Sequence, residues 1–142
     1  MTLAIRRIDP AALLPTYAHP GDSGMDVRSI ETVTLRPGDR ALVRTGLVFQ
    51  LPPDAEAQVR PRSGLALRYG VTVLNAPGTI DAGYRGEVGV ILVNLGAEPF
   101  TVEKGMKVAQ VVVASVVRAE VVEVAETDTT ERGTDGFGST GV

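Results

Sequence analysis

An arginine, a serine and a glycine follow one another at a point in the chain where an anion could bind. Arg62, Ser63 and Gly64 stand where a predicted strand ends and a short predicted helix begins. Free backbone N–H groups at a helix start, a hydroxyl and a guanidinium can all point at one phosphate group. Read alone, the same residues fit the capped start of a helix equally well.

A second stretch, residues 74–86, combines an amide, a carboxylate and an aromatic ring around a turn. Pro77 and Gly78 favour the turn, with Asn75 before it and Asp81 and Tyr84 after it. A carboxylate three residues from an aromatic ring could hold a water molecule and a sugar together. Taken alone, an ordinary turn built on the Asp side chain explains the carboxylate better.

A glutamine interrupts the longest apolar stretch of the chain, residues 108–117. The side-chain amide of Gln110 needs hydrogen-bond partners if it is buried. It either satisfies backbone groups in the core or faces a ligand, and its position alone favours the core.

The last residues of the sequence combine a guanidinium and an aromatic ring with small and hydroxyl-bearing residues. They include Arg132, Phe137, Gly138, Ser139 and Thr140. Glycine lets a backbone approach a ligand closely. A featureless flexible tail would explain the glycines and hydroxyls, but it gives no reason for the guanidinium and the ring.

Several other motifs fail on their context. Gly136, Gly138 and Gly141 have the spacing of a dinucleotide-binding fingerprint, which needs a strand before it and a helix after it. Neither lysine stands in the Gly-Lys-Ser/Thr context of a phosphate-binding loop. His19 is the only histidine, so it is predicted to be a turn residue rather than a zinc ligand.

The elements that must position these residues are predicted to be short strands joined by turns. The chain is rich in Val and contains 16 Gly and 9 Pro, while aromatic residues make up only 4%. Such a composition favours an all-β sandwich or jelly roll with an aliphatic core. Residues 10–26 read as a turn-rich connection, and residues 63–69 as one short helix that Ser63 caps and Gly70 ends. The predicted strands are residues 3–8, 32–36, 40–45, 47–51, 56–60, 71–74, 87–95, 100–103, 107–114 and 116–123.

Length, charge and cysteine content exclude several classes of function. The 142 residues suit a single domain. A net charge of −3, without a run of Lys or Arg, argues against a nucleic-acid polymer as partner. With no cysteine, neither a disulfide framework nor a thiol nucleophile is available. The apolar stretch at 108–117 is about half the ~20 residues that span a bilayer, and the first residues lack a secretory signal. We therefore expect a soluble, cytoplasmic protein.

Taken together, the segments resemble the five sequence motifs of the trimeric dUTPase family, in the same order and spacing. The resemblance covers nearly the whole chain, and its second and third motifs are the most specific. The matching stretches are residues 24–27 (GMDV), 62–66 (RSGLA), 78–86 (GTIDAGYRG), 105–110 (GMKVAQ) and 132–141 (RGTDGFGSTG).

The resemblance implies an all-β, jelly-roll-like domain over residues 1–125 and a flexible C-terminal lid over residues 126–142. It implies hydrolysis of dUTP to dUMP and pyrophosphate by attack of water on the α-phosphorus. This reaction removes dUTP and supplies dUMP for thymidylate synthesis. Family members are threefold trimers whose active sites draw on three chains, and strands such as residues 107–114 could supply contacts along the axis.

Residue roles also follow from the resemblance. Asn75, with Thr79 in the same hairpin, would bind uracil, and Tyr84 would pack under the deoxyribose and exclude a 2′-hydroxyl. Asp81 would be the general base that deprotonates the attacking water. Arg62, Ser63, Gly64 and Gln110 would hold the triphosphate, and Asp26 would position Mg²⁺ through water. In the closed lid, Phe137 would stack on the uracil while Arg132, Ser139 and Thr140 grip the γ-phosphate, and Gly138 would be a further substrate-binding residue.

The chain departs from the family pattern at two places, and two alternatives stay open. Met106-Lys107 replaces a common acidic-basic pair, and Met25 and Val27 replace smaller and Leu residues. Neither change removes a catalytic group. The alternatives are a dCTP deaminase of the same fold and a non-catalytic nucleotide-binding relative. The first would need a carboxylate that residues 88–95 do not offer.

Overall fold

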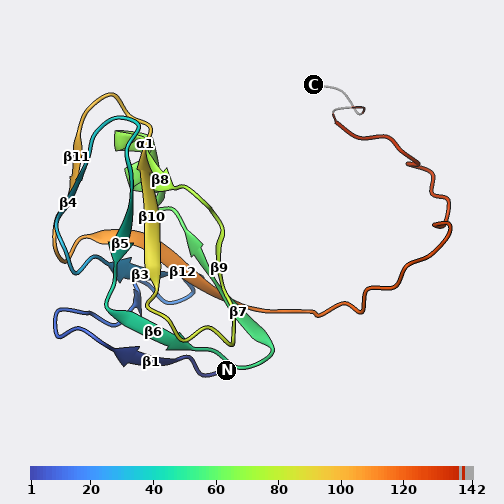
Figure 1. Cartoon of the computed structure of the whole chain (residues 1–142), viewed down its shortest axis with the longest axis horizontal. Helices are drawn as coiled ribbons and strands as arrows, with labels where there is room; N and C mark the ends of the chain where they lie inside the picture. The colour runs from blue at the N-terminus through green and yellow to red at the C-terminus, as the bar shows by residue number, and fades with distance from the viewer. Residues whose placement is uncertain (138, 140–142) are drawn as a thin grey trace.

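The computed structural model describes residues 1–137 and 139 of the chain, and in this part it contains many short strands and one short helix (Figure 1). The elements are β1 (Ala4–Arg7), β2 (Thr16–Tyr17), β3 (Met25–Arg28), β4 (Val33–Leu35), β5 (Arg40–Arg44), β6 (Leu47–Gln50), β7 (Ala55–Arg60), α1 (Ser63–Tyr69), β8 (Val71–Val73), β9 (Gly78–Ile80), β10 (Gly89–Asn94), β11 (Phe100–Val102) and β12 (Lys107–Ser115).

The strands form antiparallel sheets that face one another, which confirms the predicted all-β, jelly-roll-like class. The largest sheet has the order β2-β3-β12-β7-β9, and a second has the order β5-β10-β8. Two further pairs, β1-β6 and β11-β4, close the lower and outer edges of the body in Figure 1. Long β12 lies in the middle of the largest sheet and pairs with β3 on one side and β7 on the other.

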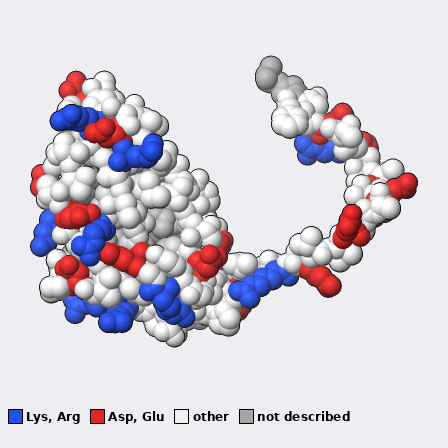
Figure 2. All heavy atoms as spheres, viewed as in Figure 1, with Lys and Arg blue, Asp and Glu red and all other residues white. Residues whose placement is uncertain are grey.

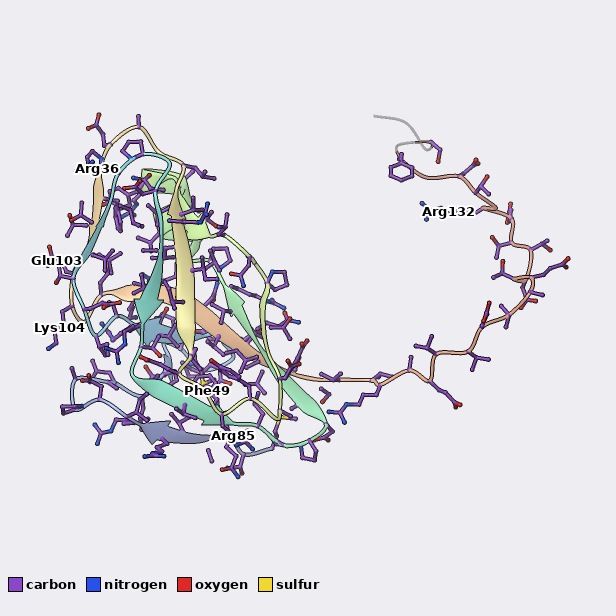
Figure 3. All side chains as sticks on the ribbon, in the orientation of Figure 1. Arg36, Phe49, Arg85, Glu103, Lys104 and Arg132 are labelled. Atoms are coloured by element: carbon purple, nitrogen blue, oxygen red, sulfur yellow. The ribbon has the colours of Figure 1, made fainter. Side chains whose placement is uncertain are left out.

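The core between the sheets is aliphatic, as the composition predicts. In β7, residues at alternate positions are buried, because successive side chains of a strand point to opposite faces. Ala57 and Val59 face the core, while Gln58 and Arg60 lie on the outer face. Phe49 is the largest fully buried side chain and is labelled inside the body in Figure 3.

The helix forms at the predicted residues, but its start differs from the prediction. Arg62, rather than Ser63, occupies the N-cap position, and no side chain makes a capping hydrogen bond. Ser63 is instead the first helical residue. The end is as predicted: Gly70 adopts the left-handed conformation with φ of 68°, and its N–H donates to the carbonyl of Ala66.

Three segments differ from the predicted strand pattern. Residues 10–26, predicted as a connection, contain β2 and the start of β3, because β2, β3 and β12 pair side by side despite the Pro and Gly residues around them. Residues 78–80 form β9 against β7. Residues 116–123 form no strand, because no edge of the same chain pairs with them.

Beyond β12 the described residues leave the body as an extended and almost wholly exposed segment (Figure 1). Lys and Arg are interspersed with Asp and Glu over the face of the body seen in Figure 2. Within residues 1–137 and 139, no helix is long and apolar enough to cross a membrane.

Candidate active site

A row of polar side chains crosses the middle of the largest sheet. Gln110 of β12 stands opposite Asp26 of β3 on one side and opposite Arg60 of β7 on the other. Directly paired residues of neighbouring antiparallel strands project on the same face. The sheet therefore brings together side chains from three segments that are far apart in the sequence.

This row forms the floor of a pocket of about 360 Å³ next to the start of α1. The pocket contains each residue predicted to bind phosphate in the body of the chain, together with the residue predicted to act on a metal. Its lining residues include Arg62, Ser63, Gly64, Gln110 and Asp26. We call it the anion pocket. Arg60, Asp22 and Ser23 also line it and were not predicted.

The Asp26 carboxylate is held between two cations at the edge of the anion pocket. Arg62 Nε lies 3.2 Å from Oδ1, and Lys107 Nζ lies 2.5 Å from Oδ2. Arg62 also donates from Nη1 to the carbonyl of Lys107 at 3.3 Å. These contacts fix the guanidinium over the pocket, and they link the second predicted motif to the first and fourth.

The donor set of the anion pocket fits a magnesium ion that is bound mainly through a ligand. In the described part of the chain no group of three or more His, Cys, Asp or Glu side chains could enclose a metal. Mg²⁺ commonly keeps several waters and binds to substrate phosphates with one or two carboxylates. Asp22 and Asp26 both line the anion pocket and could supply such contacts.

The side chain of Gln110 satisfies a backbone group and also borders the anion pocket. Its Nε2 donates to the carbonyl of Pro61 at 3.0 Å, which satisfies a backbone group just before α1. Gln110 also lines the anion pocket. It therefore ties the helix start to the centre of the sheet.

A second pocket, of about 250 Å³, lies around the hairpin that contains β9. It brings together Asn75, Thr79, Asp81 and Tyr84, the four residues predicted to bind base and sugar and to activate water. The N–H of Tyr84 donates to the carbonyl of Asp81 at 3.0 Å, so the carboxylate and the ring belong to one tight turn. We call it the hairpin pocket.

The two pockets are separate within one chain. They share no lining residue. The neighbouring residues Val59 and Arg60 line different pockets, because they point to opposite faces of β7. A ligand confined to one of these pockets would therefore contact Arg62 or Asp81 of one chain, but not both.

The described residues of the tail lie in neither pocket. Arg132, labelled in Figure 3, donates to the carbonyl of Asp135 at 2.9 Å, and it stands well away from the body. Phe137 is fully exposed. The N–H of Ser139 donates to the carbonyl of Gly136 at 3.1 Å. Gly138 and Thr140 lie outside the described residues.

Some residues of the pockets could not be found from motif spacing alone. Arg60 precedes Arg62 by two positions and lies at the end of a strand, which is a weak signal for a shared face. Leu42 and Glu87 line the hairpin pocket from β5 and from the segment before β10. These two residues line the pocket because of how the sheets pack, and this packing cannot be predicted from the local sequence.

Comparisons with known proteins agree with the motif resemblance. The family model described as dUTPase matches residues 11–141. The chain is 56% identical to the deoxyuridine 5'-triphosphate nucleotidohydrolase of Clostridium novyi (strain NT) over 142 residues, which cover 100% of both chains. It is also 56% identical to the enzyme of the same name from Clostridium acetobutylicum, over 100% of this chain and 98% of the other.

A solved structure shares the whole architecture. The dUTPase of Staphylococcus bacteriophage 80alpha with dUPNHPP superposes with a TM-score of 0.93 at 28% identity, covering 99% of each chain.

Proposed function

Because the chain belongs to the dUTPase family, we propose that it hydrolyses dUTP to dUMP and pyrophosphate by attack of water on the α-phosphorus. The observation that carries the proposal is the pair of chemically distinct pockets. One offers guanidinium, hydroxyl and amide groups for an anion, and the other offers an amide, a carboxylate and an aromatic ring for a nucleoside.

We propose that the hairpin pocket binds uracil through Asn75 and the backbone around β9. The side chain of Asn75 lies against Gly78, and buried Val59 and Ile80 supply apolar walls. Cytosine would present an amine donor where uracil presents an acceptor, which would leave buried groups unpaired at a cost of about 1–3 kcal/mol each. A tight backbone would exclude the methyl group of thymine.

In the same proposal Tyr84 packs under the deoxyribose, and Thr79 borders the nucleoside from β9. A ring in van der Waals contact with C2′ leaves no space for a 2′-hydroxyl, so UTP is rejected by shape. Asp81, on the turn that Tyr84 closes, accepts a proton from the water that attacks the α-phosphorus. A positioned general base of this kind typically contributes about 10²–10⁴-fold to the rate.

The triphosphate is assigned to the anion pocket. Arg62 offers a planar fork that suits phosphate oxygens, and Ser63, Gly64 and Gln110 add hydroxyl, backbone and amide donors. Phosphoryl transfer depends mainly on alignment and charge neutralisation, which these donors supply. Bound Mg²⁺ would neutralise charge on the phosphate oxygens, and Asp26, which Arg62 and Lys107 hold in place, would position its water ligands.

We further propose that the active enzyme is a homotrimer in which the anion pocket of one copy meets the hairpin pocket of another. Separate pockets within one chain support this arrangement, because Asp81 and Arg62 must face the same triphosphate. Exposed apolar side chains support it too: Leu42, which borders the hairpin pocket, is 62% exposed in the single chain. A closed symmetric ring would cover such surfaces.

The tail, residues 126–142, is proposed to act as a lid contributed by a further copy. In the single chain Arg132 stands away from the body and Phe137 is fully exposed. In the closed site Phe137 and Gly138 would cover the base, and Arg132, Ser139 and Thr140 would bind the γ-phosphate. A lid of this kind excludes water and strengthens the electrostatic contacts beneath it.

The test is pyrophosphate release with Mg²⁺, measured side by side for dUTP, UTP, TTP and dCTP. Rapid turnover is expected for dUTP, with each of the other nucleotides slower by about 10²-fold or more. A parallel assay for ammonia with dCTP tests the deaminase alternative. Failure to release pyrophosphate from dUTP, or equal rates for dUTP and TTP, would refute the proposed function.

A further inference from the structure

The segment that carries Tyr84 is attached to the corner between β5 and β6. We call residues 44–47 the β5–β6 corner. Its Thr45 Oγ1 donates to the carbonyl of Val88 at 2.5 Å, and its Leu47 carbonyl accepts from the N–H of Val88 at 2.7 Å. Thr45 is buried, so these bonds form a protected anchor at the end of the segment.

Glu87 makes the remaining attachments of the segment. Its Oε1 accepts from the N–H of Gly46 at 2.8 Å, and its Oε2 lies 3.1 Å from Arg44 Nε. The hydrogen bond that Arg44 donates to the Glu87 carboxylate raises the pKa of Arg44, whose side chain is about half exposed. Exposed ion pairs contribute little, whereas a backbone N–H donating to a carboxylate forms one of the stronger hydrogen bonds. The bond to Gly46 is therefore the more important of the two.

Tyr84 is in turn held by the segment that Glu87 attaches. Its hydroxyl donates to the carbonyl of Glu87 at 3.1 Å, and its ring packs so close to Gly86 that a Cβ there would collide with it. The backbone end of the residue is fixed by the turn to Asp81. The ring is thus held at both ends, and its outer end depends on where Glu87 sits.

We propose that Glu87 is a positioning residue that sets the discrimination between deoxyribonucleotides and ribonucleotides, by attaching the segment that holds the ring of Tyr84 to the β5–β6 corner. The inference rests on the proposed function, in which Tyr84 lies under the sugar. Tyr84 can exclude a 2′-hydroxyl by shape only if its ring is held in a fixed position. A ring free to move outward would admit a 2′-hydroxyl. The kcat/KM for UTP would then rise relative to that for dUTP.

The test compares kcat/KM for dUTP with that for UTP in a graded set of variants. Glu87→Ala removes both side-chain contacts and is expected to lower the dUTP/UTP ratio about tenfold, equivalent to about 1.4 kcal/mol. Glu87→Gln keeps an oxygen for the N–H of Gly46, and Arg44→Met removes only the ion pair. Both are expected to stay within about twofold of the wild-type ratio.

A merely structural defect would lower kcat/KM for both nucleotides equally and leave the ratio unchanged. Tyr84→Phe removes the hydroxyl that reaches the carbonyl of Glu87. If Glu87 acts through Tyr84, the effect of Glu87→Ala on the ratio becomes smaller in the Tyr84→Phe background, as a double-mutant cycle would show. An undiminished effect in that background would overturn the route through Tyr84.

Thermal unfolding of each variant checks its fold. Should Glu87→Ala fail to fold, Glu87→Asp decides the question, because a side chain one methylene shorter cannot keep both contacts, and the ratio is expected to fall about threefold. If every folded variant with a shortened side chain at Glu87 keeps the wild-type dUTP/UTP ratio of kcat/KM, the inference about Glu87 is wrong, but the proposed function is not affected. Absence of dUTP turnover in the unsubstituted protein would instead remove the proposed function itself.

Discussion

Asp81 is the residue on which the proposed chemistry depends, and its position is fixed by a short turn. The carbonyl of Asp81 accepts from the N–H of Tyr84 at 3.0 Å, so the carboxylate and the aromatic ring belong to one tight turn. A nucleophilic water needs such a carboxylate within hydrogen-bond reach. Arg62, Ser63 and Gln110 lack the basicity to replace it.

Replacement of Asp81 by Asn is expected to lower kcat for dUTP by about 10²–10⁴-fold, because the amide keeps the shape of the side chain but cannot accept the proton. Binding of the imido analogue dUPNHPP, measured by calorimetry, is expected to persist. In water labelled with heavy oxygen, the unsubstituted protein should place the label in dUMP. Equal turnover by the variant would contradict the general-base role, and label in pyrophosphate would contradict attack on the α-phosphorus.

Individual site residues could be predicted where a motif fixes residue type and spacing together. Asp81, Tyr84, Arg62 and Gln110 were found in this way, and each lines one of the two pockets. Glu87 could not be found, since its contact with Gly46 joins positions 41 residues apart and exists only because the β5–β6 corner packs against the hairpin.

At the scale of elements, the junction between α1 and β8 packs closely against the loop between β10 and β11. Gly70 has a positive φ, and a Cβ added there would lie 2.6 Å from the backbone nitrogen of Gly96. No side chain can therefore be accommodated without movement of the loop before β11. The helix that carries Ser63 and Gly64 depends on this close approach.

We predict that Gly70→Ala destabilises the protein more than Gly38→Ala, its matched control. Both glycines have positive φ, but an added Cβ at Gly38 meets nothing within 4 Å. The free energy of unfolding of the control should fall by roughly 1–2 kcal/mol, because alanine is disfavoured in the left-handed conformation. Gly70→Ala should lose at least about 1 kcal/mol more because of the collision. Denaturant unfolding measures the stability of both variants. Equal decreases in the free energy of unfolding would show that the loop before β11 moves aside without cost.

Strands and helices were predicted correctly where hydrophobic periodicity and turn residues agreed. The prediction failed where pairing with a distant strand decides whether a strand forms. Strand β7 and the end of α1 at Gly70 followed from alternation and a left-handed glycine. Residues 117–121 alternate between apolar and charged side chains, yet a strand also needs a partner edge, and no described residue pairs with this segment after Val116 donates to Asp54. Conversely, β2 and β3 form within a Pro- and Gly-rich stretch because β12 pairs with β3.

The tail is predicted to act in closure of the site rather than in folding of the body. A chain that ends at Thr130 lacks Arg132 and Phe137 but keeps every strand of the body. It should show an unchanged oligomeric mass by light scattering and lose most of its dUTP turnover, because the γ-phosphate and the base are left uncovered. Full activity of the shortened chain would exclude a lid.

At the scale of the whole molecule, the proposed shared site needs more than one copy of the chain. We predict that the protein elutes with three times the 14.9 kDa mass of one chain. In such a trimer the hairpin pocket of one copy would face the anion pocket of the next. A stable monomer with full activity would contradict this arrangement, because Val59 and Arg60 direct the two pockets to opposite faces of β7.

Mixing two inactive variants tests the shared site most directly. Asp81→Asn damages only the hairpin pocket and Arg62→Ala only the anion pocket, so each variant alone should barely turn over dUTP. When equal amounts are refolded together, about a quarter of the sites should combine an intact hairpin pocket with an intact anion pocket from another copy. Pyrophosphate release should then rise to about a quarter of the wild-type rate. If mixed oligomers form and the rate does not rise, Asp81 and Arg62 do not act on one nucleotide from different chains.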